Sequence, residues 1–405
     1  MDDLQRIAGG LAARLHRAVA IDDPQLHLLA HTPHHGEIDD LRMESIMRLE
    51  VPQAIVDHVL SLGIAQSTTP VRIPANSGAG MLARVCVPVR CQGMLLGYLW
   101  LFDSDGSLTP DDLDASQAAA DAAGQVLFRQ QLLGDLRDSR ERELLRDLLS
   151  QDESLHASAA TSLVEEEMAP QSCTATALAI EVGPDHEDAA RLAMDAVLRT
   201  VARRSPVAGL ALARGNGRGV LLLCSRRAPS ATNVRAVAAD ARESLLHALN
   251  APDGVTVGVG PTAPALSVAA LSAKRAWEAV AVAGSIRSLG DIAAWEDLGI
   301  YKLLARLPQH DIEDTLPEGL VRLLESDRGG VLVETLETWL DRGGDPRETI
   351  ARLSIHRTSL YYRLGRIEEI TGMHLSDGDD RLALHLGMKV ARLLGHTTGS
   401  NAGTA

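Results

Sequence analysis

Side chains that could contact nucleic acid gather in one short segment of this 405-residue chain. Residues 353–367 read LSIHRTSLYYRLGRI, and two of the four tyrosines, Tyr361 and Tyr362, stand side by side there. Arginine can donate two hydrogen bonds to a guanine edge, serine and threonine can bond to bases or phosphates, and tyrosine hydroxyls bind phosphates. The segment therefore has the side chains that binding in a DNA groove requires.

The local charge supports this interpretation. From Arg347 to Arg366 there are five arginines and one glutamate, a charge of +4 in a chain of net charge −15. An acidic chain is unsuited to coating nucleic acid with its whole surface, but one basic element can still bind it. The alternative is a surface helix whose tyrosines pack on a neighbouring domain.

Three helices are predicted around the segment: residues 331–342, a short helix from Asp345 to about Arg352, and a third from about His356 to Thr371. The first ends at a glycine pair, and the second begins with an Asp-Pro capping signature. A glycine follows the third helix, as is common at helix C-termini. A three-residue turn joins the last two helices, which predicts a helix-turn-helix whose final helix contacts DNA.

The apolar residues of the third helix indicate which side faces outward. Leu360, Leu364 and Ile367 recur at helical spacing and are expected to pack inward. The other side chains then lie opposite them or on the flanks, as DNA-binding candidates. These candidates are His356, Arg357, Thr358, Ser359, Tyr361, Tyr362, Arg363 and Arg366.

Residues 349–394 resemble the C-terminal helix-turn-helix of the PucR/CdaR family of transcription regulators, which implies a sequence-specific DNA-binding protein. The chain departs from the family pattern at Ile350, where alanine is usual between the two helices, and at Thr358, Ser359 and Tyr361. The last three departures lie on the DNA-facing side and imply an altered target sequence. The matching residues are Leu353, Ile355, His356, Arg357, Leu360, Tyr362, Arg363, Leu364, Arg366, Ile367, Thr371 and Gly372.

Upstream, residues 1–130 are predicted to form an antiparallel sheet covered by helices. Alternating valines around position 87 indicate a half-buried strand. Residues 88–127 resemble a GAF domain, which implies a sensor role. Tyr98, Trp100 and Phe102 alternate along one strand and therefore share a face, which is more often core than ligand pocket.

A helical pattern continues from Phe128 to Gln151 and carries a narrow stripe of leucines. One interpretation is a connector that dimerises as a short coiled coil. The other is a surface helix packed on its own chain. Residues 152–172 are polar and acidic, which is typical of a linker. The leucines of the stripe are Leu132, Leu136, Leu144, Leu148 and Leu149.

Residues 173–300 are predicted to have the β-α-β-β-α-β order of a ferredoxin-like fold. They resemble the degenerate GGDEF-like domain of the same regulators. An active diguanylate cyclase would carry an acidic turn here, but residues 214–219 read RGNGRG and offer no carboxylate to hold Mg²⁺. Asn216 and Gly217 favour a two-residue hairpin turn. A structural role is therefore favoured over a relict nucleotide site, and no enzyme activity is expected.

A histidine-rich segment is a weaker candidate site. His27, His31, His34 and His35 lie near Glu37, so metal binding is conceivable. A polar surface loop is the favoured interpretation, because neither cysteines nor helical histidine spacing accompany them. We expect no metal and no cofactor.

The remaining composition is that of an intracellular protein of several domains. One core rarely grows beyond about 250 residues. The first 30 residues lack a secretory signal, and no apolar run approaches the ~18 residues of a membrane span. We therefore expect a cytoplasmic protein without membrane contact. Its cysteines, expected to be small core residues, are Cys86, Cys91, Cys173 and Cys224.

The predicted fold class is multidomain α+β, and the predicted function is a DNA-binding transcription regulator with double-stranded DNA as partner. One short recognition helix contacts too few base pairs for specificity, so a homodimer is expected. A small-molecule effector is implied by analogy with relatives. The alternatives are a nucleotide-binding enzyme and a protein-interaction module. The expected parts are a GAF-like domain (1–130), a helical connector and acidic linker (131–172), a GGDEF-like domain (173–300), a linker (301–320), an all-α helix-turn-helix domain (321–395) and a disordered tail (396–405).

Overall fold

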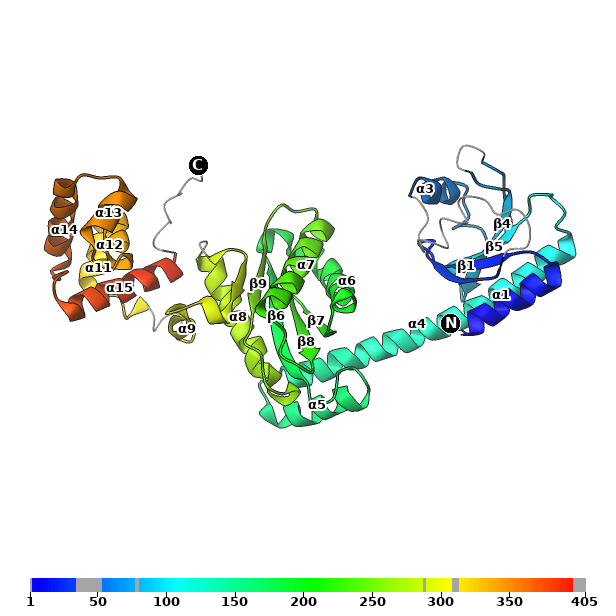
Figure 1. The fold of residues 1–405 in the computed structure, drawn as a ribbon, viewed down its shortest axis with the longest axis horizontal. Coiled ribbons are helices and arrows are strands. Elements are labelled where there is room, and N and C mark those ends of the chain that lie inside the picture. The colour runs from blue at the N-terminus through cyan, green and yellow to red at the C-terminus, as the bar shows by residue number, and fades with distance from the viewer. Residues whose placement is uncertain (1, 34–52, 77–79, 287–288, 308–312, 396–405) are drawn as a thin grey trace. The chain divides into compact units, whose positions relative to one another are not determined.

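The computed structural model describes residues 2–33, 53–76, 80–286, 289–307 and 313–395. The chain divides into two compact units, Met1–Ser139 and Arg140–Ala405 (Figure 1). The first unit and the beginning of the second combine a sheet with helices, and the C-terminal part is helical. The predicted mixed α+β class with a C-terminal helical region is therefore confirmed. No helix in the described ranges has both the length and the apolar character needed to span a membrane.

The first unit has a five-stranded sheet in the order β2-β1-β5-β4-β3, and every neighbouring pair is antiparallel. Helices accompany it in the described residues. The strands are β1 (Val19–Asp22), β2 (Leu28–His31), β3 (Val71–Ile73), β4 (Arg84–Cys91) and β5 (Met94–Phe102), and the helices are α1 (Asp2–Leu15), α3 (Gln53–Ser61) and α4 (Pro110–Leu148).

Both faces of this sheet are covered. Val85 and Val87 belong to the cluster under α1 and α4. Cys86 belongs to a cluster on the opposite face, with Tyr98 and Trp100, whose rings form a tilted pair 6.1 Å apart. The prediction of a half-buried β4 was wrong, because Cys86 is buried as fully as its neighbours. The prediction that Tyr98 and Trp100 lie in core is confirmed.

The second unit begins with a five-stranded sheet in the order β10-β9-β6-β8-β7, antiparallel except for the β9–β10 pair. The predicted β-α-β-β-α-β order is present, with β10 added. The strands are β6 (Thr174–Val182), β7 (Ala208–Arg214), β8 (Arg218–Ser225), β9 (Val255–Val259) and β10 (Ile292–Ala294), and the helices are α5 (His156–Glu165), α6 (Glu187–Arg204), α7 (Ala231–Leu249) and α8 (Ala269–Ser285).

The turn between β7 and β8 lies where the sequence predicted it, but it is longer than expected. Arg214 pairs with Arg218, which leaves a loop of residues 215–217 rather than a two-residue turn. Asn216 and Gly217 both have positive φ values, 62° and 63°. Asparagine and glycine tolerate this left-handed conformation best, which explains why they occupy the turn.

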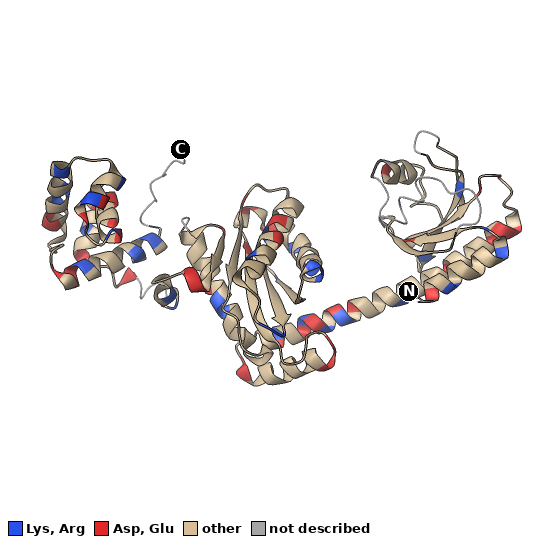
Figure 2. Cartoon of the chain, viewed as in Figure 1, with Lys and Arg blue, Asp and Glu red and all other residues tan. Residues whose placement is uncertain are grey.

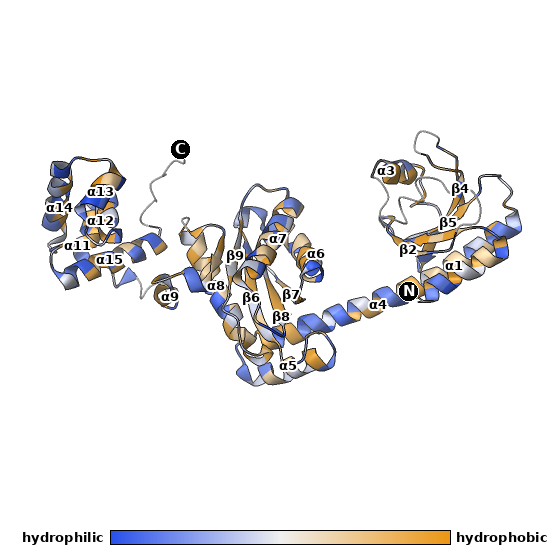
Figure 3. Ribbon diagram, in the orientation of Figure 1, coloured by the Kyte–Doolittle hydropathy of each residue, from blue (hydrophilic) through white to orange (hydrophobic). Residues whose placement is uncertain are grey.

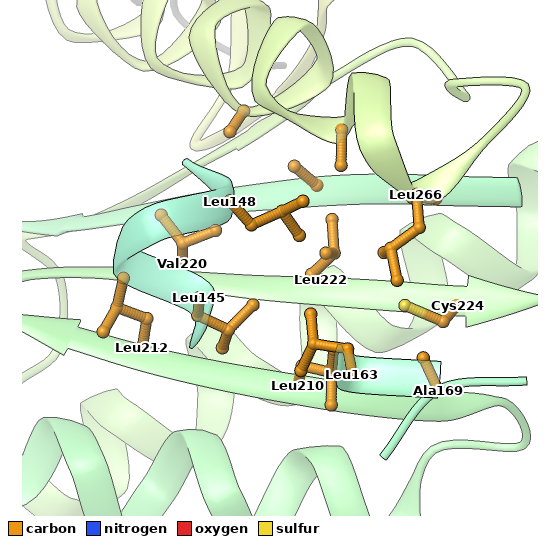
Figure 4. Close-up of a cluster of buried hydrophobic side chains, with 14 of the residues drawn as sticks. Leu145, Leu148, Leu163, Ala169, Leu210, Leu212, Val220, Leu222, Cys224 and Leu266 are labelled. Carbon is orange, nitrogen blue, oxygen red and sulfur yellow. The ribbon is translucent and has the colours of Figure 1, made fainter. Parts of the chain in front are cut away.

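The segment expected to be an acidic linker is instead part of the core of the second unit. Leu145 and Leu148, at the end of α4, pack with Leu163 of α5 against strands β7 and β8 (Figure 4). The acidic residues of this segment are all exposed and lie before α5 or at its end; they are Asp152, Glu153, Glu165, Glu166 and Glu167. The opposite face of the sheet is covered by α6 and α7, so apolar strands lie between two helical layers (Figure 3).

The C-terminal helices enclose a third core. Leu320, Leu336, Leu360, Leu384 and Met388 are all buried in it. The helices in this core are α11 (Glu318–Ser326), α12 (Val331–Asp341), α13 (Pro346–Leu353), α14 (Arg357–Thr371) and α15 (Gly378–Leu393). The short helix α9 (Tyr301–Leu304) packs in another cluster, with α8.

Candidate nucleic-acid interface

Capping interactions fix where the two helices of the predicted motif begin. Asp345 precedes α13, and its Oδ1 accepts hydrogen bonds from the amides of Arg347 and Glu348, at 2.7 and 3.0 Å. Ser354 has a φ of 52° and ends α13 in a left-handed conformation. The chain turns there and enters α14 within two residues. The predicted start of α13, the turn and the end of α14 at Gly372 are all confirmed.

The apolar side of α14 packs on α11 and α12. Leu360 and Ile367 have no exposed surface, and Leu364 is 7% exposed. The predicted phase of this helix is therefore confirmed. The opposite side of the helix faces solvent, and its exposed members from the predicted set are His356, Arg357, Thr358, Ser359, Tyr361, Tyr362 and Arg366.

Arg357 and Tyr361 form a defined pair on this exposed side. They are four residues apart, so they lie on the same side of the helix. The guanidinium carbon of Arg357 lies 5.5 Å from the centre of the Tyr361 ring, a cation–π distance. The stack restricts the arginine side chain while leaving its edge able to donate. Tyr362 points elsewhere and is 76% exposed.

His356 has a structural role at the first turn of α14. Its Nδ1 accepts from the Thr358 amide at 3.4 Å and lies 2.9 Å from the Thr358 hydroxyl. The imidazole therefore caps the helix N-terminus, where backbone N–H groups otherwise lack partners. In this arrangement Nε2 is the ring atom left to meet a ligand.

The comparisons with known proteins agree with this geometry. Residues 332–390 match the family model described as the PucR C-terminal helix-turn-helix domain. The chain carries a PucR-type helix-turn-helix domain. The matched range includes all of α13 and α14 and most of α12 and α15, so it covers most of the C-terminal core described above, to which α11 adds Leu320 and Leu323.

Full-length relatives are named as regulators. The proline-responsive transcriptional activator PutR of Bacillus subtilis is 21% identical over 96% of this chain and 97% of its own length. The DNA-binding transcriptional activator AdeR of the same species is 21% identical over 97% of this chain and 94% of its length. The carbohydrate diacid regulator of Escherichia coli is 38% identical over 96 residues, 24% of this chain and 25% of that protein.

One predicted residue of the PucR-type domain differs from the rest of the set. Arg363 is only partly exposed, and its Nη1 donates to Thr335 Oγ1 of α12 at 3.2 Å. It follows Leu360 by three residues and so lies near the core side. That spacing is the signal in the sequence that separates it from the exposed set. Arg366 is exposed, but it donates to Glu369 at 2.7 Å.

The exposed basic surface of the PucR-type domain also includes side chains of α13. Arg347 and Arg352 are exposed, and they contributed to the local charge without being chosen as candidates. Figure 2 shows basic residues on both α13 and α14. The first helix of such a motif crosses the DNA backbone, so basic residues on it suit phosphates rather than bases.

The other candidate sites gain no support. The structure contains no group of three or more histidine, cysteine or acidic residues suited to a metal within its described ranges. His27 pairs with Asp23 at 2.9 Å. His34, His35 and Glu37 lie outside the described residues, as does the predicted tail.

Proposed function

We propose that this protein is a sequence-specific transcription regulator that contacts DNA bases with the exposed side of α14. The observation that carries the proposal is the stacked Arg357–Tyr361 pair on the outer side of a PucR-type helix. A restrained guanidinium is suited to donating two hydrogen bonds to guanine. The names of the relatives, which are transcriptional activators and regulators, support the same function.

The exposed residues would have different roles in the complex. Arg357, Thr358 and Ser359 lie in the first turns of α14, the part that usually reaches base edges. Tyr362 and Arg366 would contact phosphates and orient the helix. Arg363 would act by holding α14 against α12 through Thr335 rather than by touching DNA.

The remaining parts of the chain would control this domain. We assign residues 1–130 to a GAF-like sensor and residues 173–300 to a GGDEF-like domain without catalytic activity, linked to the DNA-binding domain at 321–395. Because one relative is named as responsive to proline, a small metabolite is the proposed class of effector. The protein would act as a homodimer on two half-sites.

The test is selection of genomic DNA fragments by purified full-length protein at two salt concentrations. We expect an enriched motif with two related half-sites, spaced by one or two helical turns of DNA. Arg357→Ala should lower specific affinity by about 1–3 kcal/mol, roughly 5- to 150-fold. Arg235→Ala, which removes an exposed arginine of α7, is the matched control for charge and should leave affinity unchanged.

Two outcomes would contradict the proposal. If Arg357→Ala and the control behave alike on the selected site, Arg357 is not a base contact. If the protein binds DNA only weakly, without a motif and only at low salt, binding is nonspecific. A protein partner for α14 would then be the better explanation.

A further inference from the structure

The middle of α4 has a sequence unsuited to a helix that stands alone in water. Residues 129–137 are helical, and all of them are exposed. Leu132, Leu133 and Leu136 fall within this stretch, with 47%, 60% and 67% of their surfaces exposed. Gly134 lies between them, although glycine is the weakest helix former after proline. Exposed leucines are usually scattered singly, so three within two turns call for a partner.

The leucine patch continues along α4 into a groove that is lined by both apolar and charged side chains. Leu133 lies seven residues after Val126, so the two point in nearly the same direction. Val126 lines a groove of about 500 Å³ between α1 and α4, together with Ile7 and Ala122. The rest of the lining is polar, and its ion pairs join Asp3 to Arg6 and to Arg129. Three leucines alone would bury much less than the roughly 800 Å² that each partner contributes to a stable interface. The groove lengthens the face along α4 and so brings the surface that could be buried closer to about 800 Å² per partner.

From this continuity we infer that the face formed by Leu132, Leu133, Leu136 and the α1–α4 groove is the dimer interface, and that its occupant is the same face of a second copy. The inference deepens the proposed function, because it specifies where the two DNA-binding protomers join. The face is continuous within the first unit, so a pair of identical faces can close around a two-fold axis.

Charges beside the patch indicate how the two helices run. Asp135 and Arg137 adjoin Leu136 on either side, so they lie on opposite flanks of the patch. In a parallel pair, each flank faces the opposite flank of the partner helix, and an acidic side meets a basic side. In an antiparallel pair, like flanks meet and the charges repel. The second copy therefore binds in parallel orientation.

The experiment measures the mass of the full-length protein by sedimentation, without DNA, across the micromolar range. Wild type should be a dimer, and the double substitution Leu133→Glu/Leu136→Glu should be a monomer. Leu192→Glu is the matched control, since Leu192 of α6 is 81% exposed and lies outside the face. It should remain a dimer. A wild-type monomer, or a double variant that stays dimeric, would overturn the inference.

A second measurement covers the case in which the double variant misfolds, and it tests orientation. Gln125 lines the groove and precedes Leu136 by about three helical turns, so it lies on the same side of α4. Under mild oxidation Gln125→Cys should form a cross-linked dimer only if the helices are parallel and in register. Wild type, with its partly exposed Cys91, is the control. A cross-link no stronger than that of wild type would exclude the parallel pair.

The two proposals can fail separately. If α14 does not bind DNA, the sedimentation results are unaffected, because they are obtained without DNA. If the dimer face is elsewhere, Arg357→Ala still lowers DNA affinity and the Glu variants remain dimeric. When both hold, the double Glu variant keeps weak binding to a single half-site and loses the tighter binding to paired half-sites.

Discussion

The position of Tyr361 in the structure gives one reason why the basic segment contains tyrosines. Its ring lies beneath Arg357, so its contribution is to hold another side chain in place. Tyr362 is next to it in sequence, but it points elsewhere and is much more exposed. The adjacent pair therefore consists of one supporting residue and one residue available for direct contact.

Replacing the ring tests this role. Tyr361→Ala should weaken specific binding by about 0.5–1 kcal/mol, the strength of an exposed cation–π contact. Tyr361→Phe keeps the ring and should bind nearly as wild type does. Titration of each variant with the selected DNA site gives the comparison. A loss in the Phe variant equal to that in the Ala variant would instead assign the effect to the hydroxyl.

At the scale of elements, the packing of α14 is the feature that substitutions can test most directly. Leu360 of α14 is fully buried against α11 and α12, whereas Tyr362 of α14 is exposed. Truncating a buried leucine leaves a cavity that neighbouring side chains fill only partly. Substitution of Leu360 therefore tests the stability of this core, whereas substitution of Tyr362 tests a contact with a ligand.

Leu360→Ala should destabilise the C-terminal helical core by about 2–5 kcal/mol. Hydrogen–deuterium exchange of the α14 amides should become correspondingly faster. Tyr362→Ala is the control, because a surface substitution usually changes stability by less than about 0.5 kcal/mol. Equal exchange in wild type and Leu360→Ala would mean that α14 is not anchored by its apolar side.

The contact between α12 and α15 should depend on pH. Burial alone would raise the pKa of Asp341, but hydrogen bonds from Lys389 and His385 of α15 hold the pKa below its ordinary value. A carboxyl whose pKa is lowered in the folded state stabilises the fold fully at pH values above its ordinary pKa of about 3.9. This stabilisation is lost as the pH falls through the lowered pKa of the folded state.

Asp341→Asn should therefore remove part of the acid sensitivity of this domain. The urea midpoint of wild type should fall more steeply than that of the variant between about pH 5 and about pH 3. Asp253→Asn, in an exposed loop, should leave the steepness unchanged. If the urea midpoints of wild type and Asp341→Asn fall equally steeply with pH, the contact of Asp341 with α15 does not contribute to the acid sensitivity.

Sequence patterns predicted elements well where a period or a cap was strong. The spacing of Leu360, Leu364 and Ile367 gave the phase of α14, and Asp345 with its following proline gave the start of α13. The patterns failed at α5, whose buried side consists of Ala159, Ala160 and Leu163. Alanines carry little hydrophobic signal, and the acidic residues beside them indicated a linker.

The sequence predicted which residues of α14 are exposed, but it did not predict the partners of their side chains. Exposure follows from helical period, whereas Arg363 turns toward Thr335 because α12 happens to present a hydroxyl there. The stack of Arg357 on Tyr361 depends on rotamers. The four-residue spacing of Arg357 and Tyr361 places them on one side of α14 without fixing the stack. The partner of Arg363 cannot be read from spacing within one helix, because Thr335 belongs to α12.

At the scale of the whole molecule, α4 is the element shared by both units. Gly124 lies close to the sheet of the first unit, where a Cβ atom would be 2.4 Å from the Arg90 carbonyl oxygen. Farther along the same helix, Leu144 and Leu148 are buried in the second unit. One uninterrupted helix therefore supplies anchor residues to two separate cores.

This continuity limits how the length of the chain can vary. Residues can be added to a flexible loop at little free-energy cost. Within α4, each added residue turns every later side chain by about 100° and advances it by about 1.5 Å. Within this one helix, a single insertion would therefore change the direction in which Leu144 and Leu148 point relative to Gly124, whereas a seven-residue insertion would nearly restore it.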